Sequence, residues 1–113
     1  MFWSKKDKPG YYKGKHYTEW VDQVKQLKRE DKQIETEKLL LALVDAVEAE
    51  SKVQKLGAAP WYYEELAIAY RKAKNYSAEI EVLERFNKQT FNKKPDQFLE
   101  RIEKAKALLK KVQ

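Results

Sequence analysis

The sequence contains no cysteine, and it has only three glycines and three prolines among its 113 residues. Without cysteine the chain has no disulfide bonds, no thiolate metal site and no cysteine nucleophile. Few glycines and prolines leave long uninterrupted stretches, which favour helices over the frequent turns of an all-β chain. No apolar run approaches the ~20 residues of a transmembrane helix, and no signal-like apolar segment follows the basic start. We therefore expect a cytoplasmic protein without a membrane partner.

Groups for catalysis are also scarce. His16 is the single histidine, so the chain has no histidine pair for a metal ion. Ser4, Ser51 and Ser77 have no base near them in the sequence, and no glycine-rich phosphate loop is present. The sequence therefore predicts a protein that is not an enzyme and that uses no cofactor.

Charge is abundant, because 37% of the residues are charged and the formal net charge is +6. Lysines and arginines gather towards both ends of the chain, while the middle is slightly acidic, so a uniformly cationic nucleic-acid coat is not expected. The 42% of hydrophobic residues suffices for one domain with one modest core.

Apolar residues recur at helical spacing in five segments, which predicts an all-α fold of about five helices. Residues 1–16 show no such periodicity and are expected to form a basic, aromatic arm. Thr18 and Ser77 are the expected N-caps, and Gly57 is expected to end a helix in a left-handed conformation. The predicted helices run from Thr18 to about Lys28, from Ile34 to Lys52, from Pro60 to Lys74, from Ser77 to about Phe86 and from about Asp96 to Val112.

The most specific pattern is Tyr63-x2-Leu66-Ala67-x2-Tyr70 followed by Glu79-x3-Leu83. It resembles the tetratricopeptide repeat, W-x2-L-G-x2-Y followed by A-x3-F, which is a helix-turn-helix pair. The small Ala67 would let the partner helix approach closely. Glu79 stands where the family prefers alanine, which suggests a solvated or loosened contact between the two helices.

An earlier, degenerate copy of the pattern lies in residues 20–43. Trp20, Val24 and Leu27 match the first helix, and Thr36, Leu40 and Leu43 match the second. The resemblance implies a small bacterial-type member of the family with about two degenerate repeats. Its helical domain would be 17–113, made of repeat one at 17–52, repeat two at 60–86 and a closing helix at 96–112. A generic antiparallel helical bundle is the alternative fold.

In such repeats the first helix of each pair lines a concave surface that binds a peptide or a partner protein. Two basic pairs, Lys28-Arg29 and Arg71-Lys72, occupy equivalent places in the two repeats and could hold a partner's carboxylates. We therefore expect a basic groove for an acidic peptide or partner, although solvated helix ends would show the same charges. The candidate partner-binding residues are Lys25, Lys28, Arg29, Trp61, Glu64, Ile68, Arg71 and Lys72.

Two other partners remain open. Lysines interleave with aromatic residues in the segment 2–16, and such residues can neutralise phosphates and stack on unpaired bases. A nucleic-acid-binding accessory protein that uses the basic ends is therefore the alternative function, and a packed or flexible lead-in is the plainer interpretation of the segment. The chain is expected to be a monomer or a weak homodimer, and exposed Trp61, Tyr62 or Phe91 could form the dimer contact.

Overall fold

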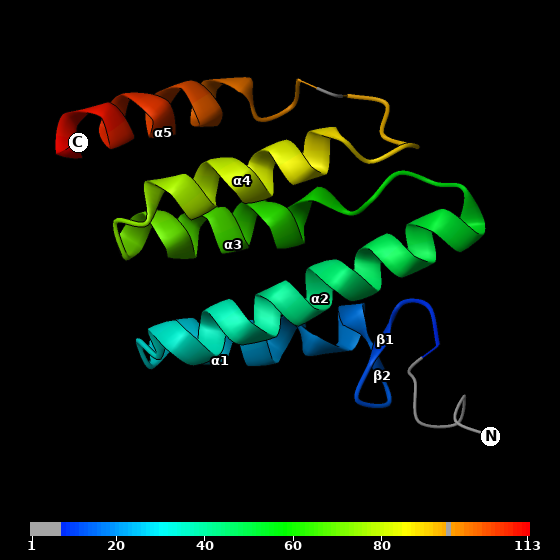
Figure 1. Cartoon of the computed structure of the whole chain (residues 1–113). Helices are drawn as coiled ribbons and strands as arrows, with labels where there is room; N and C mark the ends of the chain where they lie inside the picture. Colours follow the sequence, from blue (N-terminus) through cyan, green and yellow to red (C-terminus); the bar gives the residue numbers. More distant parts are fainter. Residues whose placement is uncertain (1–7, 95) are drawn as a thin grey trace.

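The computed structural model describes residues 8–94 and 96–113 (Figure 1). In this part of the chain helices dominate, and the only strands form one short hairpin, which confirms the predicted all-α fold of about five helices. The helices are α1 (Val21–Arg29), α2 (Gln33–Gln54), α3 (Pro60–Lys72), α4 (Tyr76–Asn87) and α5 (Leu99–Val112). They follow β1 (Tyr11–Tyr12), β2 (Lys15–His16) and the short 3-10 helix η2 (Tyr17–Trp20).

The five α-helices form a stack in sequence order, and each packs on the next with the chain direction reversed (Figure 1). The residues of the repeat-like pattern lie at its centre: Tyr63, Leu66, Ala67 and Leu83 are all 0% exposed. Each fully buried leucine contributes ~2 kcal/mol relative to an exposed one. Ala67 leaves room for the neighbouring helices, as a small residue at a helix crossing should.

Helix α5 closes the stack with one buried and one polar face. Ile102 and Ala105 are buried on the inner side. The outer side is exposed and mostly charged, and it comprises Glu100, Glu103, Lys104, Lys110 and Lys111. A polar outer face on the last helix ends an array of packed helices without leaving a large apolar surface.

Both predicted N-caps are wrong by two residues. The His16 side chain caps η2 by accepting a hydrogen bond from the Thr18 amide, and the Asn75 side chain caps α4 by accepting one from Ala78. A capping side chain must precede the amide that it satisfies, and Thr18 lies inside the first turn of η2. Ser77 likewise lies within α4.

The end of α2 also differs from the prediction. The residue with the left-handed conformation is Lys55, with φ of 58°, and Gly57 has no positive φ. Gly57 serves a different purpose, because a Cβ there would lie 3.3 Å from the carbonyl oxygen of Phe91. The lack of a side chain thus lets the α4–α5 connection approach the α2–α3 connection. Helix α5 begins at Leu99, since residues 96–98 form a turn.

Residues 8–16, which the sequence analysis assigned to the arm, form an antiparallel hairpin that packs against α2. Residues 1–7 of that arm lie outside the described residues. Gly10 has φ of +91°, and a Cβ on it would lie 2.5 Å from Oε2 of Glu50 on α2. The hairpin therefore needs glycine here both for its backbone conformation and for its close approach to α2.

Candidate partner-binding surface

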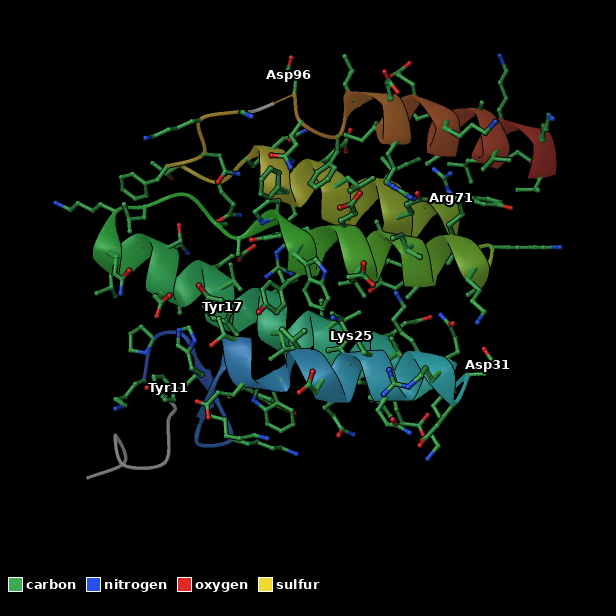
Figure 2. All side chains as sticks on the ribbon, turned by 180° about the vertical axis from the view of Figure 1, so that it is seen from behind. Tyr11, Tyr17, Lys25, Asp31, Arg71 and Asp96 are labelled. Carbon is green, nitrogen blue, oxygen red and sulfur yellow. The ribbon has the colours of Figure 1, made fainter. Side chains whose placement is uncertain are left out.

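The eight candidate residues occupy α1 and α3, but they do not form one surface. Figure 2 labels two of them, Lys25 on α1 and Arg71 on α3. Lys28, Ile68 and Lys72 line a small cleft bounded by α1, the start of α2 and α3, which is termed the α1–α3 cleft. Glu64 and Arg71 line a different cleft, between α3 and α5. The remaining three, Lys25, Arg29 and Trp61, line neither of these clefts.

The cleft between α1 and α3 has a volume of about 80 Å³. Lys72 Nζ lies 2.5 Å from Asp31 Oδ1, and Lys28 forms an ion pair with Glu65 across the two helices. The hydrogen bond from Lys72 and its charge hold the pKa of the Asp31 carboxyl below its usual value. The cleft is lined by Lys28, Asp31, Lys32, Gln33, Thr36, Ile68, Ala69 and Lys72.

The two ion pairs differ in exposure. The side chains of Lys72 and Asp31 are 61% and 73% exposed, so water screens their attraction. Such a surface pair adds little to stability, and another carboxylate can take the place of Asp31. In the second pair Glu65 is only 15% exposed, so its attraction to Lys28 is less screened. Lys25 and Arg29 extend the basic area along α1, and neither forms an ion pair with another described residue.

Arg71, by contrast, is hydrogen-bonded to a buried carboxylate. Glu79 on α4 is 0% exposed, and Arg71 Nε donates to its Oε1 at 3.0 Å. Arg101 on α5 donates from Nη1 to Glu79 Oε2 at 2.9 Å. The expectation of a solvated Glu79 is therefore wrong, because two guanidinium groups supply the hydrogen bonds and the charge that a buried carboxylate requires. Helices α3, α4 and α5 meet at this one side chain.

The cleft between α3 and α5 is larger, about 850 Å³, and carries both signs of charge. Two of its cations are the guanidinium groups bound to Glu79. The predicted basic character is thus confined to α1 and the α1–α3 cleft. The larger cleft is lined by Glu64, Arg71, Asp96, Gln97, Phe98, Leu99, Glu100, Arg101 and Lys104.

The aromatic residues expected at a dimer contact are less exposed than predicted. Tyr62 is only 4% exposed, and its ring packs edge-on against Tyr17 with centroids 5.1 Å apart. Burial raises the pKa of Tyr62 to about 12. Trp61 and Phe91 are half-buried. The prediction of an exposed Tyr62 is wrong because the N-terminal hairpin and η2 bring Tyr17 over it.

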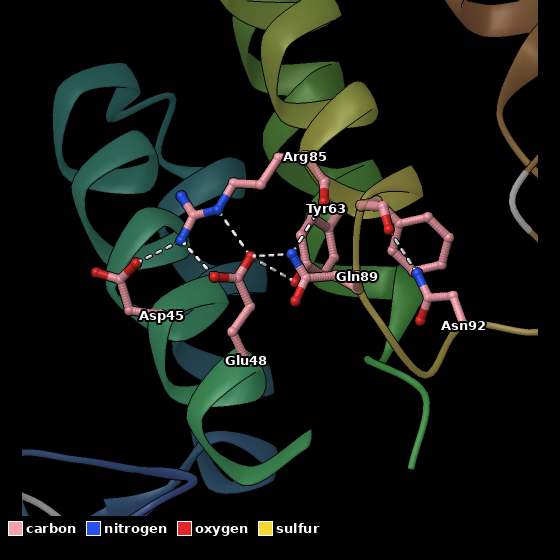
Figure 3. Close-up of polar contacts among 7 residues, drawn as sticks. Asp45, Glu48, Tyr63, Arg85, Gln89 and Asn92 are labelled. Carbon is pink, nitrogen blue, oxygen red and sulfur yellow. Dashed lines mark hydrogen bonds and ion pairs between the residues drawn. The ribbon is translucent and has the colours of Figure 1, made fainter. Parts of the chain in front are cut away.

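A polar network that sequence reasoning missed joins α2 to α3 and α4 (Figure 3). Arg85 donates from Nε to Glu48 Oε2 at 2.7 Å and from Nη2 to Asp45 Oδ1 at 2.7 Å. Tyr63 donates its hydroxyl hydrogen to the same Glu48 oxygen at 2.8 Å. Burial and the neighbouring Glu48 charge raise the pKa of Tyr63 above its usual value. The network is internal and fixes the register of the three helices.

His16, the single histidine of the sequence, joins the hairpin to α2. Its Nδ1 accepts from the Thr18 amide at 3.3 Å, so Nε2 carries the proton and donates to Glu50 Oε2 at 2.8 Å. Tyr17 donates to the other Glu50 oxygen at 2.9 Å, and burial followed by this hydrogen bond raises the pKa of Tyr17 to about 12. One imidazole nitrogen therefore caps η2, and the other links the hairpin to α2.

Comparison with family models, with curated proteins and with solved structures finds no match to this chain. Within residues 8–94 and 96–113, no helix is long and apolar enough to cross a membrane. The same part of the chain contains no group of three or more histidine and acidic residues that could hold a metal ion.

Proposed function

We propose that the chain is a non-catalytic protein-interaction module of the tetratricopeptide kind, and that it binds an acidic segment of a partner protein. The observation that carries the proposal is the α1–α3 cleft, where Lys28, Lys32 and Lys72 surround Ile68. Lys28 and Lys72 come from the two basic pairs, Lys28-Arg29 and Arg71-Lys72, that occupy equivalent places in the two repeats, and Lys32 lies in the connection after α1.

An acidic segment suits this cleft better than a neutral one. Lys28 and Lys72 already hold carboxylates of the chain itself, namely Glu65 and Asp31. A partner carboxylate would replace the exposed Asp31 at Lys72 at little cost, because a screened surface pair contributes little stability. Lys25 and Arg29 would extend the contact along α1, and Ile68 would contact the aliphatic part of a glutamate side chain.

The repeat interpretation is supported by the order of packing and by the end of the array. Helices α1 with α2 and α3 with α4 form two consecutive pairs, and the polar outer face of α5 is typical of a terminal cap. The proposal includes a cytoplasmic location, in keeping with a sequence that has no cysteine. It includes no catalytic role for His16, since both of its nitrogens are hydrogen-bonded internally.

Affinity capture from a lysate of the native cell, followed by mass spectrometry, tests the proposal. The test variant carries Lys25→Gln, Lys28→Gln, Arg29→Gln and Lys72→Gln, and it spares Arg71 because of the buried Glu79. A control variant with Lys88→Gln, Lys93→Gln, Lys110→Gln and Lys111→Gln changes the net charge equally. We expect the test variant to lose a partner with an acidic segment that the control retains. Retention by the test variant, or equal loss from both, would overturn the proposal.

A further inference from the structure

The N-terminal hairpin carries a second, separate cationic surface. Lys15 Nζ lies 4.0 Å from the ring centroid of Trp20, and Lys13 Nζ lies 5.4 Å from that of Tyr12. The two rings are themselves in contact, with centroids 5.4 Å apart and planes inclined at 52°. Two ammonium groups thus lie over one aromatic pair, and this cluster of Tyr12, Lys13, Lys15 and Trp20 is termed the hairpin platform.

The hairpin platform is held in a fixed position by the rest of the fold. Trp20 Nε1 donates to the carbonyl oxygen of Tyr12 at 3.1 Å, and the Tyr17 amide donates to the Gly10 carbonyl oxygen at 2.9 Å. The His16–Glu50 hydrogen bond ties the same hairpin to α2. A ligand that binds here therefore meets rings and ammonium groups that are already ordered, which lowers the entropic cost of binding.

Lysines outnumber carboxylates on the hairpin itself. Residues 8–18 contain three lysines and no acidic residue. Two nearby carboxylates bind His16: Glu19 accepts from its amide at 3.1 Å, and Glu50 accepts from its Nε2 at 2.8 Å. The hairpin platform therefore combines ammonium groups with the half-buried rings of Tyr12 and Trp20, and these are the two kinds of group that recognise a single-stranded polyanion with bases.

We propose that the hairpin platform binds single-stranded nucleic acid. A base stacks on Trp20 or Tyr12 and displaces the lysine that covers the ring, and the lysine turns to a neighbouring phosphate. The exchange is favourable because stacking of a base on an aromatic ring outweighs an exposed cation–π contact. The lysine in turn gains a phosphate and releases the counterions bound there. This surface involves none of the residues of the α1–α3 cleft, so the inference is independent of the proposed function.

Binding of a 12-nucleotide oligothymidylate, followed by fluorescence anisotropy at low salt, tests the inference. The test variant is Lys13→Gln with Lys15→Gln, and the charge-matched control is Lys110→Gln with Lys111→Gln on the exposed end of α5. We expect the test variant to weaken binding roughly tenfold and the control less than twofold. No binding by the unaltered chain, or equal effects of the two variants, would overturn the inference.

Two further probes separate base stacking from simple charge. An abasic 12-mer offers negative charge without bases, and we expect it to bind at least tenfold more weakly than oligothymidylate. In a Trp3→Phe, Trp61→Phe variant, Trp20 is the only tryptophan left, and stacking should quench its fluorescence. Equal binding of the abasic probe, or unquenched Trp20 with bound oligothymidylate, would contradict a base-stacking surface.

Discussion

Arg71 and Lys72 are neighbours at the end of α3, yet their surroundings are opposite. Arg71 binds Glu79, which is 0% exposed, and contacts α4 and α5. Lys72 binds Asp31 near the start of α2, and that side chain is 73% exposed. Successive residues on a helix point about 100° apart, so one side chain faces the packed helices and the other faces solvent. Equal charge and adjacent position in the sequence therefore do not imply an equal role.

Arg71 is therefore a structural cation, whereas Lys72 can exchange its carboxylate partner. Removing Arg71 would leave the buried Glu79 with one guanidinium group, whereas removing Lys72 would leave Asp31 in water. The α3–α5 contact is therefore expected to be fixed, while the α1–α3 cleft keeps its cations available to a partner.

The largest effect is expected from Arg71→Ala. Loss of one partner of the buried Glu79 should lower the free energy of unfolding by about 3 kcal/mol, because the carboxylate stays buried with part of its charge unmatched. Urea unfolding followed by circular dichroism measures this loss. A loss below about 1 kcal/mol would show that Glu79 is not a buried structural charge.

Tyr63→Phe should have the next largest effect. It removes the hydroxyl that donates to Glu48 at 2.8 Å and leaves the ring in place. A hydrogen bond to a charged acceptor is worth ~1.5 kcal/mol, and the same unfolding experiment would detect its loss. Tyr70→Phe is the matched control, since no hydrogen bond from the Tyr70 hydroxyl to another described residue is found. Equal effects of the two substitutions would contradict a role for the network around Glu48.

A separate effect is expected at alkaline pH. The folded state raises the pKa of Tyr17 and Tyr62 from 10.0 to about 12. Their neutral forms thus stabilise the fold fully below pH 10, and this contribution is lost as the pH rises from 10 to 12. The melting temperature should fall within that window. Absorbance at 295 nm should show a second, later tyrosine titration, and a single titration near pH 10 would contradict the expected burial.

The smallest effect is expected from Lys72→Gln. The ion pair of Lys72 with Asp31 is exposed, so the urea midpoint should stay unchanged within error. A clear loss of stability would mean that this pair holds the helices together, and the contrast with Arg71 would fail.

The helices could be predicted from the sequence because their apolar residues recur with the helical period over about two turns or more. The caps could not, because several suitable side chains lie within one turn of each start. Thr18 and His16 both suit the beginning of η2, and only the tertiary contact with Glu50 fixes the His16 ring in the capping position.

The candidate site was predictable in composition but not in arrangement. Lys28 and Lys72, one from each of the two predicted basic pairs, line the same cleft, whereas Arg29 and Arg71 do not. The hydrogen bond of Arg71 to a buried Glu79 could not be predicted. The second cation that binds Glu79 is Arg101, which lies 22 residues further along the chain. Nor does any local pattern indicate that a glutamate on α4 is surrounded by arginines from two other helices.

The most direct test of the account maps an acidic probe on the folded chain. Backbone amide NMR shifts, recorded during titration with decaglutamate, report which residues contact it. The account predicts that the largest shifts fall in residues 25–36 and 65–72, which include the α1–α3 cleft. Shifts confined to the lysines of α5 or the hairpin, or no shifts in those two segments, would contradict it.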